Sequence, residues 1–238
     1  TAVFHLAAHS DTGFCEKRTW EGYQLNVEAT TRLVEMCAER RIRFVFTSSE
    51  QVFDGLKGNY AETDLAKPSN EYGKQKLTAE KRVEEIYPDA VIARISVLYG
   101  ASSPVRGSFL SSWLDAWQKF LGVTAFHDEI RTFLSADAAA EGLFLLLEQG
   151  ANGIFHIAGE NPMSRYDFAM LAKQAFNLPA AKVVSRSQKE MAMASFRPPN
   201  LSLICDKIRG IGYQPRSVEA ELQRLAKEIE FAPFASNN

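Results

Sequence analysis

Ile42-Arg43-Phe44-Val45-Phe46-Thr47-Ser48-Ser49 is the segment that decides the fold expected for this chain. Its core is apolar, β-branched and aromatic, which is typical of a buried strand, and it ends in hydroxyl residues. About twenty residues later, Asn70-Glu71-Tyr72-Gly73-Lys74-Gln75-Lys76 opens a segment with helical periodicity. A buried strand followed by such a helix predicts one unit of a parallel α/β sheet.

Tyr72 and Lys76 lie four residues apart at the start of this helix, so their side chains share one face of it. A phenol has an ordinary pKa of about 10, and a neighbouring ammonium lowers it by favouring the phenolate. Such a pair is suited to protonate the alkoxide that forms when hydride reduces a carbonyl. Two ordinary surface residues give the same pattern, so the motif alone does not establish a site.

Ser49 stands where the strand ends, and the carboxyl ends of strands in an open α/β sheet border the ligand crevice. Its hydroxyl is therefore expected to hydrogen-bond the carbonyl oxygen that Tyr72 would protonate. The alternative is that Ser48 and Ser49 only cap or turn the chain. A strand-end serine followed by Tyr-x-x-x-Lys on a helix is more specific than either part alone.

Strands and helices alternate along the chain, which predicts a Rossmann-type, doubly wound α/β fold with a parallel sheet. The expected strands are 1–8, 43–48, 91–98 and 153–158. The expected helices are 20–41, 70–86, 109–120, 135–149, 164–177 and 217–230, and the tail 233–238 is expected to be disordered.

Two domains follow from where the strand pattern breaks. Residues 1–100 and 135–158 are predicted to form the sheet domain, and residues 101–134 and 159–238 a smaller, mostly helical C-terminal lobe. A substrate would lie in the cleft between them. Trp113 and Trp117, at i,i+4 spacing, are expected in the core of that lobe.

The composition excludes several classes of protein. The chain has 238 residues, 46% hydrophobic and 24% charged, with a formal net charge of -2. It lacks the basic stripe of a nucleic-acid-binding protein, and its longest apolar run, around Leu143 to Leu147, is too short to span a membrane. Cys15, Cys37 and Cys205 are widely spaced and odd in number, which fits neither a disulfide framework nor a metal site. We expect a cytoplasmic protein with buried thiols, no metal, and no nucleic-acid or membrane partner.

With Ser49 at a strand end and Tyr72 and Lys76 on the following helix, the chain resembles the extended short-chain dehydrogenase/reductase superfamily. Within it, the chain is most similar to the dTDP-4-dehydrorhamnose reductase-like branch of sugar-nucleotide-binding proteins. The matching segments are Val3-Phe4-His5-Leu6-Ala7-Ala8, Asn26-Val27-Glu28-Ala29-Thr30, Thr47-Ser48-Ser49-Glu50-Gln51-Val52-Phe53-Asp54-Gly55, Tyr72-Gly73-Lys74-Gln75-Lys76, Arg94-Ile95-Ser96-Val97-Leu98-Tyr99-Gly100 and Arg197-Pro198-Pro199-Asn200.

The resemblance implies an NAD(P)-dependent oxidoreductase, with NAD or NADP as cofactor and a nucleotide-sugar as substrate; it leaves a homodimer open. It implies a catalytic triad and a set of cofactor contacts. The triad is Ser49, Tyr72 and Lys76. The cofactor contacts are Ala7, Ala8, Tyr72, Lys76, Arg94 and Ser96. Asn26 would support the lysine through water.

The substrate contacts are expected at Ser49, Glu50 and Arg131. The guanidinium of Arg131 fits phosphate oxygens, so it is a candidate diphosphate contact, with an interdomain salt bridge as an equal alternative. Arg106 and Arg197 are weaker candidates on the same logic.

Proteins of this kind begin with a strand, a glycine-rich turn and a helix that hold the cofactor pyrophosphate, and this sequence contains no such motif. We interpret the chain as a fragment without its first three βα units, and we expect this 238-residue chain by itself to be inactive. In the resembling reductases a tryptophan is usual at the position of Val97 and a tyrosine is common at the position of Gln51. Both positions are expected near the sugar pocket, so the identity of the substrate sugar stays open.

Three hypotheses remain. The first is reduction of a keto-sugar nucleotide. The second is a nucleotide-sugar epimerase or dehydrogenase, because one triad serves both. The third is a non-catalytic regulatory or binding subunit, since the regulatory subunit of methionine adenosyltransferase resembles the same branch. Dehydration is disfavoured, because Gln51 replaces an acid that would transfer a proton.

Overall fold

The structure is a computed structural model that describes residues 1–101, 107–191 and 195–229. Arg106 and the tail 233–238 lie outside these residues. A four-stranded parallel sheet with the order β1-β2-β3-β8 forms its centre. The strands are β1 (Ala2–His5), β2 (Arg43–Ser49), β3 (Val91–Ile95) and β8 (Gly153–Ile157).

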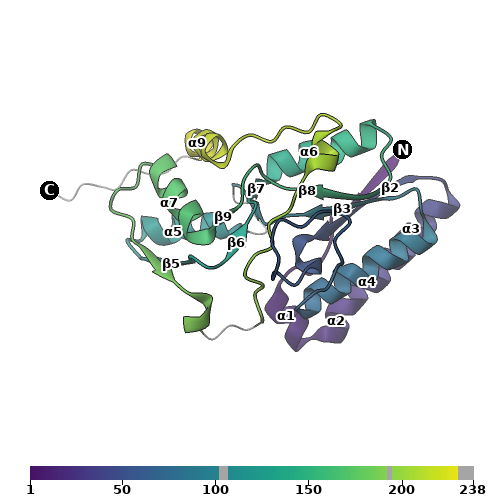
Figure 1. Ribbon diagram of the computed structural model, residues 1–238, viewed down its shortest axis with the longest axis horizontal. Coiled ribbons are helices and arrows are strands. Elements are labelled where there is room, and N and C mark those ends of the chain that lie inside the picture. The colour runs from purple at the N-terminus through teal and green to yellow at the C-terminus, as the bar shows by residue number, and fades with distance from the viewer. Residues whose placement is uncertain (102–106, 192–194, 230–238) are drawn as a thin grey trace.

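Helices cover both faces of this sheet, which confirms the doubly wound α/β class (Figure 1). One face carries α3 (Ala29–Glu39) and α4 (Glu71–Ile86), which pack Val34, Cys37 and Val83 against Phe44 and Phe46 of β2. The opposite face carries α6 (Ala136–Glu148). The strands read as continuous apolar runs because burial on both faces leaves no solvent side.

The predicted helix 20–41 is one helical path in three parts. They are α2 (Thr19–Tyr23), a π-helical turn (Gln24–Glu28) and α3. A short helix, α1 (Thr12–Lys17), precedes them and was not predicted. The π-turn carries the buried Asn26, in keeping with the frequent occurrence of π-turns at functional sites.

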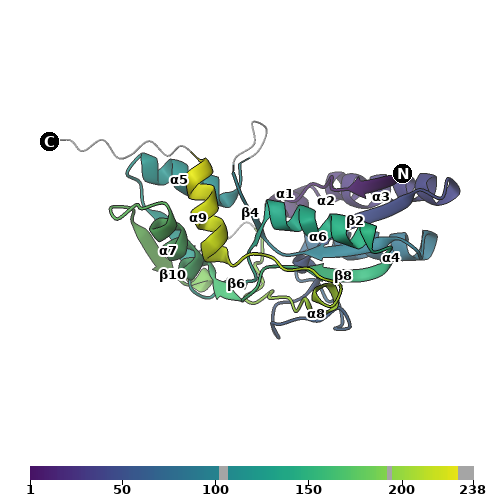
Figure 2. The same cartoon turned by 90° about the horizontal axis from the view of Figure 1, so that it is seen from above.

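A smaller lobe lies beside the sheet, as both views show (Figures 1 and 2). Its core packs Trp117 and Leu110 against Phe168 and Leu222, which confirms the buried position of Trp117. Its helices are α5 (Phe109–Gln118), α7 (Arg165–Ala175) and α9 (Val218–Glu228). Two strand pairs were missed: β5 (Val123–Phe126) with β10 (Val183–Arg186), and β6 (Ile130–Arg131) with β9 (Met163–Ser164).

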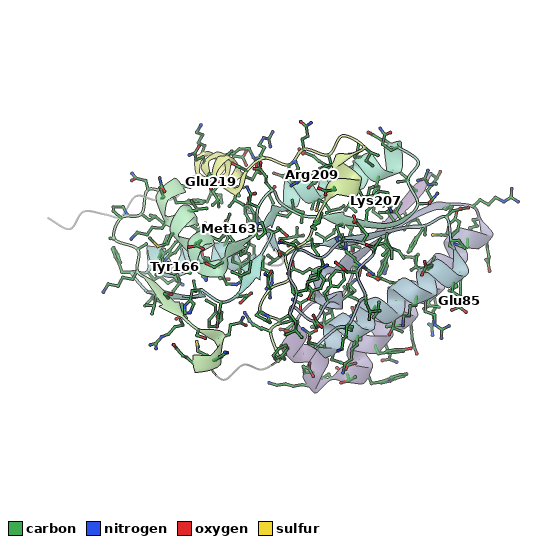
Figure 3. All side chains as sticks on the ribbon, in the orientation of Figure 1. Glu85, Met163, Tyr166, Lys207, Arg209 and Glu219 are labelled. Atoms are coloured by element: carbon green, nitrogen blue, oxygen red, sulfur yellow. The ribbon has the colours of Figure 1, made fainter. Side chains whose placement is uncertain are left out.

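After the lobe the chain returns to the sheet. Leu201, Leu203 and Ile208 join the core that β2, β3 and α6 share. The short helix α8 (Asp206–Arg209) contacts β8, where Lys207 donates a hydrogen bond to the carbonyl of Ile154 (Figure 3). By its contacts, this part of the predicted lobe belongs with the sheet.

Local signals placed the helix starts correctly. Ser135, Ser164 and Ser217 each accept a hydrogen bond from a backbone N–H three residues on, the geometry of an N-cap. The predicted strand 91–98 instead breaks after Ile95, and β4 (Leu98–Tyr99) pairs with β7 (Leu134–Ser135). No described helix is both long and apolar enough to cross a membrane.

Candidate active site

A cavity of about 640 Å³ opens where β1, β2 and β3 end at their carboxyl edge. Ser49, Tyr72 and Lys76 all line it. The structure therefore brings the three residues of the expected triad together from a strand end and a helix. Also lining it are Leu6, Ala8, Ser48, Gln51, Ser96 and Val97.

Ser49 ends β2 and caps the 3-10 turn that follows. Its Oγ accepts a hydrogen bond from the backbone N–H of Gln51 at 3.2 Å. That bond occupies the oxygen as an acceptor, so the hydroxyl hydrogen remains able to donate. Ser49 therefore caps a turn, as one alternative expected, and it also lines the cavity with its hydroxyl hydrogen still available.

The first turn of α4 fixes Tyr72 and Lys76. Asn70 caps the helix, and its Oδ1 accepts the N–H of Gly73 at 2.9 Å. Both side chains are buried, at 7% and 2% exposure. Burial on a rigid helix holds a catalytic group in one orientation, which proton transfer requires.

The ammonium of Lys76 is held at the sheet. Its Nζ donates to the carbonyl of Thr47 at 2.8 Å and lies 4.6 Å from the ring centre of Phe46. Burial lowers the pKa of Lys76 to about 8, and Glu80 opposes this shift. The lysine therefore still carries its charge at neutral pH, with two N–H groups left for other partners.

The residues expected at the cofactor divide into two groups. Ala8 and Ser96 line the cavity, whereas Ala7 is exposed and is not among the lining residues. Arg94 is also absent from the lining, because its guanidinium pairs with Glu80 of α4 at 2.8 Å and lies over Phe53. Ser96 lies one residue beyond the end of β3, whereas Arg94 lies within the strand and is held by α4.

A nicotinamide and its ribose fit this cavity on chemical grounds. The buried hydroxyl of Ser48 borders it and has no hydrogen-bond partner in the described protein. Lys76 and Ala8 line the cavity, where the ammonium would offer donors to ribose hydroxyls and the small alanine side chain would leave room for a flat ring. The glycine-rich turn that would hold a pyrophosphate is not found in the described residues.

Arg131 does not line the cavity. Its side chain is 2% exposed, and its Nε pairs with Glu50 at 3.0 Å. The remaining N–H groups face Glu129 at 3.6 Å and the carbonyls of Ile130 and Pro198. With its guanidinium fully engaged, the geometry favours the interdomain salt bridge over the diphosphate contact.

Glu50 also lies behind the cavity wall instead of within it. One oxygen accepts the hydroxyl of Ser96 at 2.5 Å and the other pairs with Arg131. Burial raises the pKa of this carboxyl, and Arg131 opposes that shift. Glu50 thus contacts a cavity residue, Ser96, but is not itself among the residues that line the cavity.

Glu129 completes the buried network. It pairs with Arg165 at 2.7 Å and with the half-exposed Arg197 at 3.5 Å. Burial acts to raise the pKa of Glu129, but Arg165 and Arg131 outweigh it and lower the pKa to about 2. The weaker phosphate candidate Arg197 is therefore also engaged in an ion pair.

Several cavity residues were not assigned from the sequence. Ala139, Ala140 and Leu143 of α6 also line the cavity. Asn26 does not contact Lys76 directly; its amide binds the backbone of His9 at 2.8 Å and Gln75 at 2.8 Å. The run of small alanines in α6 indicated that this helix can approach a neighbouring element closely, but the local sequence does not predict which face of the helix borders the cavity.

The part of the chain that is described holds no cluster of three or more His, Cys, Asp or Glu suited to a metal ion.

A model of one protein family, the RmlD substrate binding domain, matches residues 1–231. The chain belongs to this family. The match agrees with the extended short-chain dehydrogenase/reductase resemblance and with the parallel sheet.

Two curated relatives indicate different kinds of protein. The probable low-salt glycan biosynthesis reductase Agl14 of Haloferax volcanii is 30% identical over 241 residues, which cover 98% of this chain and 79% of that protein. Methionine adenosyltransferase 2 subunit beta of Rattus norvegicus is 31% identical over 222 residues, covering 90% and 66% respectively.

Solved structures match the whole arrangement. A dTDP-4-dehydrorhamnose reductase from Bacillus anthracis, in complex with NADP, has a TM-score of 0.90 at 23% identity and covers 96% of this chain and 80% of that one. A hypothetical dTDP-4-dehydrorhamnose reductase from Sulfolobus tokodaii has a TM-score of 0.81 at 29% identity, with 92% and 77% covered. The first likeness concerns the fold alone.

Proposed function

We propose that this protein reduces a keto-sugar nucleotide with NADH or NADPH. The observation that carries the proposal is the shared cavity of Ser49, Tyr72 and Lys76. The reductase names of the Haloferax volcanii relative and of the Sulfolobus tokodaii structure support the same class. Sugar nucleotides and nicotinamides are soluble metabolites, so the proposal agrees with a cytoplasmic enzyme.

Each residue has a role in the proposed reaction. A reduced nicotinamide, when bound, supplies hydride to the carbonyl carbon. Ser49 donates a hydrogen bond to the carbonyl oxygen, and Tyr72 gives that oxygen its proton as negative charge develops. The ammonium of Lys76 stabilises the phenolate that remains, until solvent returns the proton.

The test measures loss of the reduced cofactor's absorbance with dTDP-4-dehydrorhamnose as probe, in the protein at its full natural length. Tyr72→Phe should lower turnover by about 100-fold or more, because general acid catalysis contributes about 10²–10⁴-fold. Tyr87→Phe, beyond the far end of α4, is the matched control and should retain turnover. Equal turnover in the Tyr72→Phe variant would remove Tyr72 from the mechanism.

A second candidate is a subunit that binds the same ligands without turning them over. The 31% identity with methionine adenosyltransferase 2 subunit beta favours it. Cofactor binding without oxidation of the reduced cofactor by any keto-sugar nucleotide would support this role. Recycling of the cofactor within one turnover would instead support an epimerase.

A further inference from the structure

We propose that Gln51 determines substrate specificity by donating an amide hydrogen bond to a hydroxyl next to the reacting carbonyl. This inference deepens the proposed reductase function and depends on the same cavity. Gln51 lines that cavity together with Ser49 and Tyr72. It lies two residues after Ser49, on the turn that Ser49 caps.

Asn70 fixes which end of the Gln51 amide faces the cavity. The backbone N–H of Gly73 can only donate, so the Asn70 atom that it meets at 2.9 Å is the oxygen Oδ1. The other atom of the Asn70 amide is therefore Nδ2, which is a donor. It lies 2.8 Å from Gln51, so the Gln51 atom that it meets must be the acceptor Oε1.

The Nε2 of Gln51 is consequently the end that remains for a ligand. The described residues provide no partner for this nitrogen, whereas its Oε1, backbone N–H and backbone oxygen are all in contact with neighbours. Asn70 is 1% exposed and belongs to the helix cap, so it cannot turn without losing that cap. The cavity therefore presents a fixed N–H donor beside the Ser49 hydroxyl.

A fixed donor selects its ligand. An amide N–H binds a neutral oxygen and offers nothing to an ammonium group, which is itself only a donor. We therefore expect the preferred sugar to carry a hydroxyl, not an amine, beside its carbonyl. In a 4-keto-6-deoxyhexose the hydroxyl beside the carbonyl is at C3.

The experiment compares kcat/KM for dTDP-4-dehydrorhamnose and for its 3-deoxy analogue. The wild-type protein should prefer the hydroxylated sugar by about five- to tenfold, the range of one neutral hydrogen bond. Gln51→Leu removes both the donor and the acceptor of the amide and leaves a side chain of similar size. It should reduce the preference to about one.

Asn70→Asp provides the matched second variant. A carboxylate still caps the helix, but it can only accept, so Gln51 must turn its Nε2 toward residue 70 and its Oε1 toward the cavity. This variant should keep its melting temperature and its preference for the hydroxyl, which can also donate to Oε1, but unlike the wild type it should accept the 3-amino analogue, whose ammonium only donates. A purely structural role of Gln51 would change stability and leave the preference unaltered.

The outcomes separate this inference from the proposed function. Turnover with the same preference in the wild type and in Gln51→Leu would overturn the role of Gln51 and leave the reductase function standing. If calorimetry shows that the wild type binds both sugars but it reduces neither, the reductase function is wrong. The role of Gln51 is then tested by the ratio of the two Kd values in place of kcat/KM. Binding of neither sugar would overturn both.

Discussion

Gly73 lies so close to Gln51 that a Cβ atom at position 73 would meet the Gln51 carbonyl oxygen at 2.1 Å. This contact joins the first turn of α4, which carries Tyr72, to the turn that follows Ser49. The missing side chain thus allows Tyr72, the proposed proton donor, and the strand-end Ser49 to share one cavity.

Gly73→Ala should therefore damage the site. The helix or the turn must shift, and a displacement of about 1 Å can cost about 100-fold in rate. We expect kcat to fall by about that factor, with a stability loss of about 1–3 kcal/mol from overpacking. Gly100→Ala is the control, because its Cβ would meet Ala136 at an ordinary 3.5 Å. A fully active Gly73→Ala protein would contradict the close approach.

Lys76 should set an alkaline limit on activity. Its pKa of about 8 means that the ammonium loses its proton above that pH, so kcat/KM should fall as pH rises through about 8. Lys76→Arg keeps its charge there, since arginine has a pKa above 12. That variant should be less active yet lack the decline near pH 8. Lys74→Arg, at an exposed position of the same helix, is the control and should behave as wild type. If kcat/KM of Lys76→Arg still declines near pH 8, Lys76 is not the source of the decline.

Arg131 should prove to be structural. Arg131→Met leaves Glu50 buried without its partner, a loss of about 3–5 kcal/mol. Urea unfolding should detect this, while KM for the sugar nucleotide stays nearly constant. Arg82→Met, which breaks the exposed pair with Glu85 at the outer end of α4 (Figure 3), should cost less than about 1 kcal/mol. A raised KM with normal stability would restore the diphosphate role.

His156 should make the protein sensitive to acid. Burial lowers its pKa to about 4, below the ordinary 6.5. Between those values the unfolded chain binds more protons than the folded one, so the free energy of unfolding falls as pH falls through this window. Its Nδ1 contacts the carbonyl of Ile204 at 3.1 Å, and His156→Asn keeps a donor there without titrating.

Urea unfolding at pH 7 and pH 5 checks this expectation. The wild type should lose about 1–2 kcal/mol more than His156→Asn between the two pH values. His127→Asn, at an exposed position, should lose as much as the wild type. Equal losses in the wild type and His156→Asn would assign the acid sensitivity to other groups.

The comparison of sequence and structure separates two kinds of information. The apolar run 42–49, the spacing of Tyr72 and Lys76 and the serine caps are local patterns. Each predicted its strand, helix face or helix start because the backbone geometry repeats over a few residues. Ser49, Tyr72 and Lys76 could be placed near one another for the same reason, since parallel strands end at one edge.

Other features depended on contacts between distant segments. Arg94 and Arg131 have the residue type of a ligand contact, yet each meets a carboxylate supplied by another element. Strands β5 and β10, separated by more than fifty residues, pair only because the lobe folds them together.

The sequence by itself therefore determined the α/β class, the positions of most helices and strands, and the three residues of the candidate triad. Only the tertiary structure decided which polar groups face the cavity and which face one another. The physical reason is that a buried guanidinium must be paired, and its partner is chosen by packing across the whole fold. The amide of Gln51 follows the same rule, because Asn70, nineteen residues away, fixes its direction.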